Sequence, residues 1–147
     1  MSIIYRPVGE EDYEDLSVLL QQLWPNIEIS ANDISTLITR GVNSNLQKYL
    51  VAVIDNIVVG FCTLTMKNSL WVKGNLGHID ELVVHEKHRN KGIGKALLER
   101  MTKIALNMGC LCLELDSAHD SSNTNNFYEE MGFVERGSIL SKSLTNE

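Results

Sequence analysis

Two glycines one residue apart stand inside a basic run in the stretch RNKGIGKALLERM, residues 89–101. Gly92 and Gly94 cost a helix about 1 kcal/mol each relative to alanine, yet a helical pattern of apolar side chains follows at once. A helix start presents unpaired backbone N–H groups and a partial positive charge. Glycines let a phosphate approach that backbone closely, and Arg89 and Lys91 add positive charge. The stretch therefore predicts a phosphate-binding turn that opens a helix.

Two common phosphate loops do not fit this turn. A Walker loop needs a glycine at position 89, which is Arg89, and a serine or threonine at position 96, which is Ala96. A dinucleotide-binding fingerprint needs a third glycine or alanine where Leu97 stands. The spacing R-x-x-G-x-G, from Arg89 to Gly94, remains, together with the simpler interpretation of a turn with solvated lysines.

Length and composition limit the class of protein. The 147 residues favour one domain, 1–147, with a single core. No apolar run approaches the roughly 20 residues of a membrane span, and the first residues lack the basic and apolar regions of a signal peptide. We therefore expect a cytoplasmic protein that does not insert into a membrane.

Charge and cysteine content exclude further classes. The net charge of −6 disfavours nonspecific binding to nucleic acid or to an acidic membrane. Three cysteines without a secretory signal argue against a disulfide framework. Cys110 and Cys112 lie in a predicted buried strand, and a C-x-C pair without nearby histidines is a weak metal signal. We expect no metal site.

Periodicity and turn residues predict the elements that must position the phosphate-binding turn. Strands alternate with helices in the order β-α-α-β-β-β-α-β-α-β, which indicates an α/β sheet of mixed direction. A capping box, Ser30 with Asp33, begins the second helix, and Asp55-Asn56 turns a hairpin. The predicted strands lie at 2–8, 49–66 (a hairpin), 78–84, 110–115 and 133–144 (one or two strands), and the predicted helices at 10–24, 30–38, 92–109 and 123–131.

Two motifs together resemble one known family. The turn R-x-x-G-x-G follows a strand ending in ELVV, and NNFYEEMGFVERG is similar to the segment A-x-x-F-Y-x-x-x-G-F. Both resemble motifs of the GNAT superfamily of N-acetyltransferases, with a layout similar to the aminoalkylphosphonate, glucosamine-phosphate and aminoglycoside enzymes. The resemblance implies a GNAT fold, with six to seven strands in a mixed central sheet and about four helices. It also implies transfer of acetyl from acetyl-CoA to the primary amine of a small molecule in a ternary complex, by a chain that is a candidate homodimer.

The resemblance also implies where acetyl-CoA binds. A regular strand would place Ile79 and Leu82 on opposite faces, so either both faces are buried or the strand bulges, and the family favours a bulge. The freed amides at Leu82, Val83 and Val84 would then face the pantetheine arm. Family members often have an asparagine at the position of Ser121, and we expect Asn123 or Asn125 to replace it. The pyrophosphate would contact Arg89, Asn90, Lys91, Gly92, Ile93, Gly94 and Lys95.

Two proton transfers complete the implied chemistry. Glu81 and His78 are the candidate bases for the substrate amine, with Glu81 slightly favoured and Asp116 ranked below them. An exposed strand carboxylate and a packed polar side chain are the simpler interpretations of Glu81 and His78. Tyr128 matches the family tyrosine that protonates the departing thiolate, although it also suits a packing role.

The acceptor is less defined by the sequence. Trp24, Asn26 and Glu28 are candidates for its pocket, and Trp24 also suits the last core position of its helix. Trp71 is predicted at a hairpin tip or in a dimer contact. Two alternatives remain open: an acetyltransferase acting on proteins or peptides, and a non-catalytic acyl-CoA sensor on the same fold.

Overall fold

A computed structural model describes residues 2–117 and 122–145 of the chain. Its contacts divide the chain into two units, Met1–Leu115 and Asp116–Glu147.

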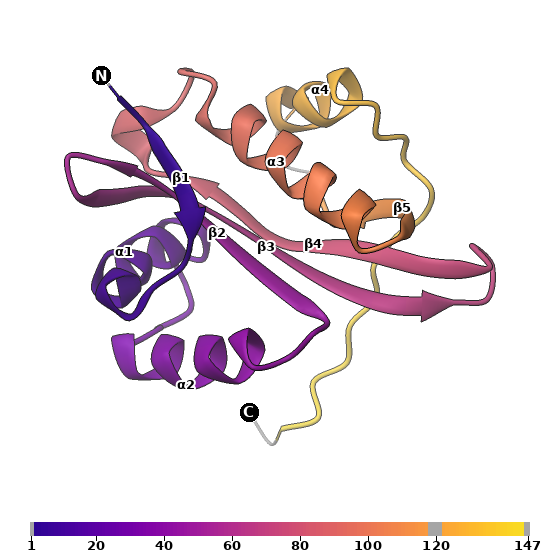
Figure 1. Ribbon diagram of the computed structural model, residues 1–147, viewed down its shortest axis with the longest axis horizontal. Coiled ribbons are helices and arrows are strands. Elements are labelled where there is room, and N and C mark those ends of the chain that lie inside the picture. The colour runs from indigo at the N-terminus through magenta and orange to yellow at the C-terminus, as the bar shows by residue number, and fades with distance from the viewer. Residues whose placement is uncertain (1, 118–121, 146–147) are drawn as a thin grey trace. The chain divides into compact units, whose positions relative to one another are not determined.

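The first unit is built on one mixed sheet of five strands in the order β1-β2-β3-β4-β5 (Figure 1). The strands β1 to β4 pair antiparallel with one another, and β5 runs parallel to β4. A parallel pair needs a crossover, and the helix α3 (Ile93–Asn107) supplies it. The strands are β1 (Ile4–Pro7), β2 (Gln47–Ile54), β3 (Ile57–Ser69), β4 (Gly74–Val84) and β5 (Cys110–Leu115).

Turn and cap residues act where the sequence predicted them. Asp55 and Asn56 have positive φ of 50° and 65°, as a tight hairpin turn requires. The backbone N–H of Asp33 donates to Ser30 Oγ at 3.0 Å, and the N–H of Ser30 donates to the Asp33 carboxylate at 3.0 Å. This capping box begins α2 (Ala31–Val42) and is confirmed.

Two helices cover one face of the sheet. A short 3₁₀ turn, Glu10–Asp12, leads into α1 (Tyr13–Leu23). The first turn of the helix predicted at 10–24 is therefore 3₁₀ and not α-helical. The helices α1 and α2 bury a shared apolar stripe against apolar side chains of β2 and β3 and against Val83 of β4 (Figure 1). The buried members from the two helices and the sheet are Leu16, Leu19, Leu20, Ile34, Ile38, Val51, Val53, Val58, Phe61 and Val83.

The helix α3 covers the opposite face of the sheet (Figure 1). It buries Ile93, Leu97 and Met101 completely or nearly so. A Cβ atom on Gly60 of β3 would lie 2.9 Å from Leu97 Cδ1, so the absence of a side chain there lets the helix approach the strand. This packing fixes the start of α3 above the end of β4.

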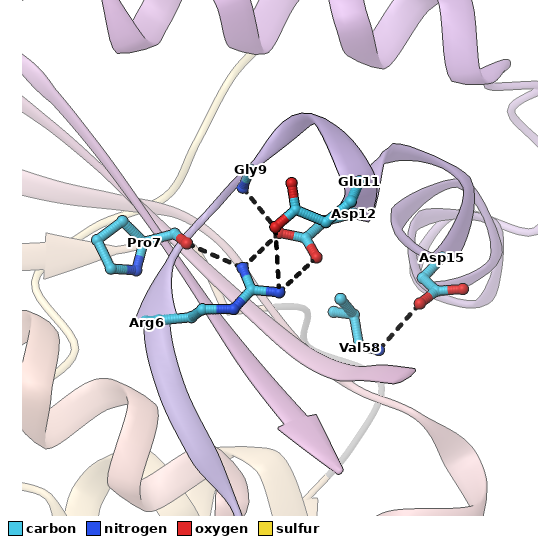
Figure 2. Close-up of polar contacts among 7 residues, drawn as sticks. All are labelled: Arg6, Pro7, Gly9, Glu11, Asp12, Asp15 and Val58. Atoms are coloured by element: carbon cyan, nitrogen blue, oxygen red, sulfur yellow. Dashed lines mark hydrogen bonds and ion pairs between the residues drawn. The ribbon is translucent and has the colours of Figure 1, made fainter. Parts of the chain in front are cut away.

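An ion pair joins β1 to the beginning of α1 (Figure 2). Arg6 binds the Asp12 carboxylate with both guanidinium nitrogens, at 2.7 and 2.8 Å, and the Gly9 N–H donates to the same carboxylate at 2.7 Å. The Asp12 side chain is almost completely buried, whereas Glu11 lies 3.7 Å from the guanidinium and is exposed. Asp12 therefore has its hydrogen-bond capacity satisfied inside the fold.

The second unit contains α4 (Ser122–Glu130), and Gly132, with φ of 94°, follows its end. The prediction of one or two strands at 133–144 is wrong, because these described residues form neither helix nor strand. A few apolar side chains satisfy only one condition for a strand, and the other is a partner for the backbone groups. Val134 and Leu140 are 87% and 94% exposed. The described sheet accordingly has five strands rather than the expected six to seven.

Candidate active site

The basic turn has the geometry of an anion site. Gly92 caps the start of α3 with φ of 82°, a left-handed conformation that glycine adopts without strain. A Cβ atom there would meet nothing within 4 Å, so space above the backbone is open. In the described structure no side chain caps this helix start and its first turn has no acid. Arg89, Lys91 and Lys95 are exposed around it. These residues fit a pyrophosphate.

The expected bulge lies in β4 and is confirmed. The β3–β4 register pairs Leu64 with Ile79 and Cys62 with Leu82. One residue of β3, Thr63, therefore stands opposite two residues of β4, Asp80 and Glu81. Both Ile79 and Leu82 pair with β3, but the bulge between them interrupts the regular alternation of side chains between the two faces of the sheet.

Thr63 joins the bulge to the Glu81 side chain. The backbone N–H of Glu81 donates to Thr63 Oγ1 at 2.9 Å, and the Thr63 hydroxyl donates to the Glu81 carboxylate at 2.9 Å. Thr63 is 2% exposed. One buried hydroxyl thus satisfies the backbone group that the bulge frees and also orients the carboxylate.

The pKa of Glu81 is shifted in the direction that suits a base near neutral pH. Burial raises the pKa of the Glu81 carboxyl, the hydrogen bond from Thr63 opposes the rise, and the charge of Asp80 adds to it. The carboxyl therefore holds its proton to a higher pH than an ordinary glutamate.

The strand β4 has an open edge beyond the bulge. Among the described residues, β4 pairs with β5 only from Asn75 to Ile79. The N–H of His85 donates to Val59 O on β3 at 2.8 Å. Backbone groups of successive strand residues point to opposite edges, so the amides of Leu82 and Val84 point away from β3, and that of Val83 points toward it. The open edge thus offers two of the three expected amides.

A cavity of about 220 Å³ opens between α1, α2 and the sheet, and Glu81 forms part of its wall. Trp24 also lines the cavity, which supports one of the predicted acceptor-pocket residues. The predicted neighbours Asn26 and Glu28 are exposed and are not among its lining residues. The remaining wall is Leu20, Ile29, Asp33, Ile34, Leu37, Ile38, Tyr49 and Phe61.

The other candidate base lies outside this cavity wall. His78 Nδ1 is 3.1 Å from the Glu114 carboxylate, and Nε2 is 4.0 Å from Asp80. Thr65 hydrogen-bonds Asp80. The side chain of His78 is therefore engaged in a polar row across β3, β4 and β5, whereas Glu81 faces the cavity.

The remaining predicted residues lie in the second unit. Asp116 follows β5, Asn123 and Asn125 fall in α4, and Ser121 lies outside the described residues. Tyr128 is half-buried and packs edge-to-face against Phe127 and Phe133, with ring centroids 5.1 and 5.8 Å away. The ring of Tyr128 therefore packs against other aromatic rings, and its hydroxyl is the group predicted to donate a proton.

Sequence reasoning missed Thr63, Tyr49 and Phe61. All three lie in the predicted hairpin, whose alternation assigns them to one face of a strand but not to a site. Only the pairing register brings Thr63 to Glu81, and only the packing of α1 and α2 brings the aromatic rings to the cavity. The Asp80–Glu81 pair between two apolar positions is the signal that could have suggested a partner on the neighbouring strand.

Neither a membrane helix nor a metal cluster is found in the part of the chain that the structure describes. No helix at 2–117 or 122–145 is long and apolar enough to cross a membrane. Within the same residues, no three His, Cys, Asp or Glu side chains come together as a metal site would require.

Comparison with known proteins gives matches to acetyltransferases. A glucosamine 6-phosphate N-acetyltransferase of Schizosaccharomyces pombe is 31% identical over 99 residues, covering 64% of this chain and 86% of that protein. The enzyme of the same name from Trypanosoma brucei brucei is 35% identical over 77 residues, and the match spans 52% of this chain and half of that protein.

Structural comparison agrees. The crystal structure of a Trypanosoma brucei acetyltransferase superposes with a TM-score of 0.83 at 25% identity, covering 97% of this chain and 100% of the other. The model of the acetyltransferase (GNAT) family matches residues 11–133, which include the bulged strand, the basic turn and Tyr128. The chain therefore belongs to the acetyltransferase (GNAT) family.

Proposed function

We propose that residues 1–147 act as one acetyltransferase domain that moves acetyl from acetyl-CoA to the primary amine of a small molecule, with Glu81 accepting the amine proton. Family membership supplies the acetyl-CoA chemistry. The observation that carries the proposal for the acceptor is the cavity in which Glu81 and Trp24 share a wall. The named substrates of the two relatives, both amino sugars, support a small acceptor.

The basic turn is the proposed site for the pyrophosphate of acetyl-CoA. The start of α3 offers unpaired N–H groups, Gly92 leaves open space above the backbone, and Arg89 and Lys91 supply positive charge. The Arg89 Nε also donates to the carbonyl of Val84 at 3.1 Å, which ties the turn to the end of β4. The pantetheine arm would extend from here along the open edge, beside the amides of Leu82 and Val84. Asn123 is a further proposed contact.

Glu81 is the proposed base. A primary ammonium has a pKa of about 10, so it is mostly charged at neutral pH and cannot attack a thioester until it loses a proton. The Glu81 carboxylate lies in the wall of the acceptor cavity, its pKa is raised by burial, and Thr63 holds its orientation. The alternative base His78 is engaged with Glu114 instead.

The remaining steps balance the reaction. The neutral amine nitrogen attacks the thioester carbonyl carbon, the carbon–sulfur bond breaks, and the sulfur leaves as a thiolate. The attacking nitrogen loses its second proton to solvent as the amide forms, and this loss balances the proton that the thiolate takes up. A backbone N–H at the open edge of β4 would polarise the carbonyl oxygen. The proposed donor of a proton to the thiolate is the Tyr128 hydroxyl, on the strength of its place in the family-like segment.

An assay of thiol release tests the proposal. The protein is incubated with acetyl-CoA and a panel of small primary amines and peptides, and free CoA thiol and acetylated products are measured. We expect amine-dependent thiol release for small amines and an N-acetyl product of matching mass. Release with peptides alone, or tight binding of acetyl-CoA without any transfer, would contradict the proposal and favour a protein acetyltransferase or a sensor.

A further inference from the structure

The wall of the acceptor cavity is mostly apolar. Three aromatic rings, those of Trp24, Tyr49 and Phe61, and aliphatic side chains from α1 and α2 form it. The hydroxyl of Tyr49 has no hydrogen left to donate to a ligand, because it donates to Gln47 Oε1 at 3.2 Å. A ligand with many hydroxyl groups would lose hydrogen bonds to water here and regain few of them.

The charge of the cavity is negative. Two acidic residues, Asp33 and Glu81, line the cavity, and none of the described lining residues is a lysine, arginine or histidine. Hydrogen bonds from Ser30 lower the pKa of Asp33, so this carboxylate is ionised at neutral pH. The cavity therefore attracts a cation and repels a phosphate.

From this wall and its charge we infer that the acceptor is a small primary amine on an apolar body, of the arylalkylamine class, and not a phosphorylated amino sugar. The inference rests on the proposed function. The ammonium lies beside Glu81, and the apolar body packs against Trp24 and Phe61. A volume of about 220 Å³ is below the roughly 300–1,000 Å³ of pockets for drug-sized ligands, which favours a short amine.

The inference separates this chain from the two relatives whose names specify glucosamine 6-phosphate. A sugar phosphate needs cationic partners for its phosphate and hydrogen-bond partners for its hydroxyls. The lining residues include no lysine, arginine or histidine for the phosphate, and only the carboxylates of Asp33 and Glu81 and the oxygen of Tyr49 could accept from the hydroxyls. This chain would therefore share the acetyl-transfer reaction with these relatives and differ from them in the amine that it accepts.

Steady-state kinetics with acetyl-CoA test the inference directly. We expect kcat/KM for phenethylamine to exceed that for glucosamine 6-phosphate by at least about 100-fold, since placing like charges together in a site costs several kcal/mol. An equal or higher kcat/KM for glucosamine 6-phosphate overturns the inference while leaving the proposed function intact. If neither these amines nor any other member of the panel consumes acetyl-CoA, both the inference and the proposed function fail.

A charge variant provides a second, independent readout. Leu37 lines the cavity yet is 57% exposed, so Leu37→Lys adds a cation at the wall with little loss of packing. We expect a decrease of about tenfold in kcat/KM for phenethylamine and an increase for glucosamine 6-phosphate, from electrostatics alone. Val42→Lys, at an equally exposed position on α2 outside the wall, is the matched control and should change neither value. The same effect in both variants, or no effect in Leu37→Lys with unchanged thermal unfolding, contradicts the inference.

Discussion

The Arg6–Asp12 pair gives a prediction whose size follows from the structure. Asp12 is 2% exposed and accepts two hydrogen bonds from Arg6 and one from Gly9. The substitution Asp12→Asn keeps the shape and removes the buried charge, which leaves the guanidinium with only the exposed Glu11 as a counter-charge. Breaking a buried pair in this way typically costs about 3–5 kcal/mol. The Arg6 side chain is 33% exposed and can partly rehydrate, so we expect about 3 kcal/mol, the lower end of that range.

The measurement is urea unfolding followed by tryptophan fluorescence. Both tryptophans, Trp24 and Trp71, lie in the first unit, so their emission reports on the unit that holds the pair. The matched control is Glu11→Gln, because Glu11 approaches the same guanidinium at 3.7 Å but is 72% exposed. An exposed pair contributes at most about 1 kcal/mol. Equal losses in the two variants, or a loss below about 1 kcal/mol for Asp12→Asn, would refute the reasoning about burial.

The pH dependence of the same variant has a definite sign. Despite the cost of burial, which acts to raise it, the hydrogen bonds from Arg6 and Gly9 lower the pKa of Asp12 below its ordinary value of 3.8. A lowered folded-state pKa means that the stabilisation is present above the unfolded-state pKa and is lost as pH falls through the folded-state pKa. The difference in unfolding free energy between wild type and Asp12→Asn should therefore be constant near neutral pH and shrink once the pH falls below about 4.

Three further predictions concern the site. Gly92→Glu should weaken acetyl-CoA binding, measured by calorimetry, by at least about 100-fold because the new carboxylate repels the phosphates. The control Gly92→Ala should keep the affinity within a few-fold and lower the free energy of unfolding by about 1–2 kcal/mol, because alanine is strained in a left-handed backbone conformation. Equal affinities for the two variants would contradict the assignment of the turn. Thr63→Val should move the pH limb of kcat/KM upward because it removes a hydrogen bond that lowers the pKa of Glu81, and Thr63→Ser should restore it; an unmoved limb would reduce Thr63 to a packing residue. Tyr128→Phe should lower kcat by about 10–10³-fold with little change in acetyl-CoA affinity, and a kcat within about twofold of wild type would leave only its packing role.

Local sequence signals predicted the parts of the site that depend on neighbouring residues. The glycines at 92 and 94 and the basic residues around them define the turn, because backbone freedom and charge act at short range. The three-residue spacing of Ile79 and Leu82 left two possibilities, burial of both strand faces or a bulge, and the family resemblance favoured the bulge. Both features were confirmed in the positions expected.

Features that depend on pairing between distant segments could not be predicted. Thr63 acquires its role only through the register of β3 against β4, which no local pattern specifies. Tyr49 reaches the cavity because of how α1 and α2 pack over the sheet. The apolar residues at 133–144 suggested strands, but a strand also needs a partner edge for its backbone, and the described residues there form neither helix nor strand.

The pH profile of kcat/KM identifies the group that accepts the proton of the substrate amine, which we propose to be Glu81. The profile is measured for wild type, Glu81→Gln and His78→Ala with the best amine of the panel. We expect kcat/KM of the wild-type protein to rise with pH through a limb above the ordinary carboxyl range, because burial raises the pKa of Glu81. His78→Ala should keep this limb, and Glu81→Gln should lose it together with about 10²–10⁴-fold in rate. A Glu81→Gln enzyme that keeps both limb and rate, or a His78→Ala enzyme that loses the limb, would contradict the account.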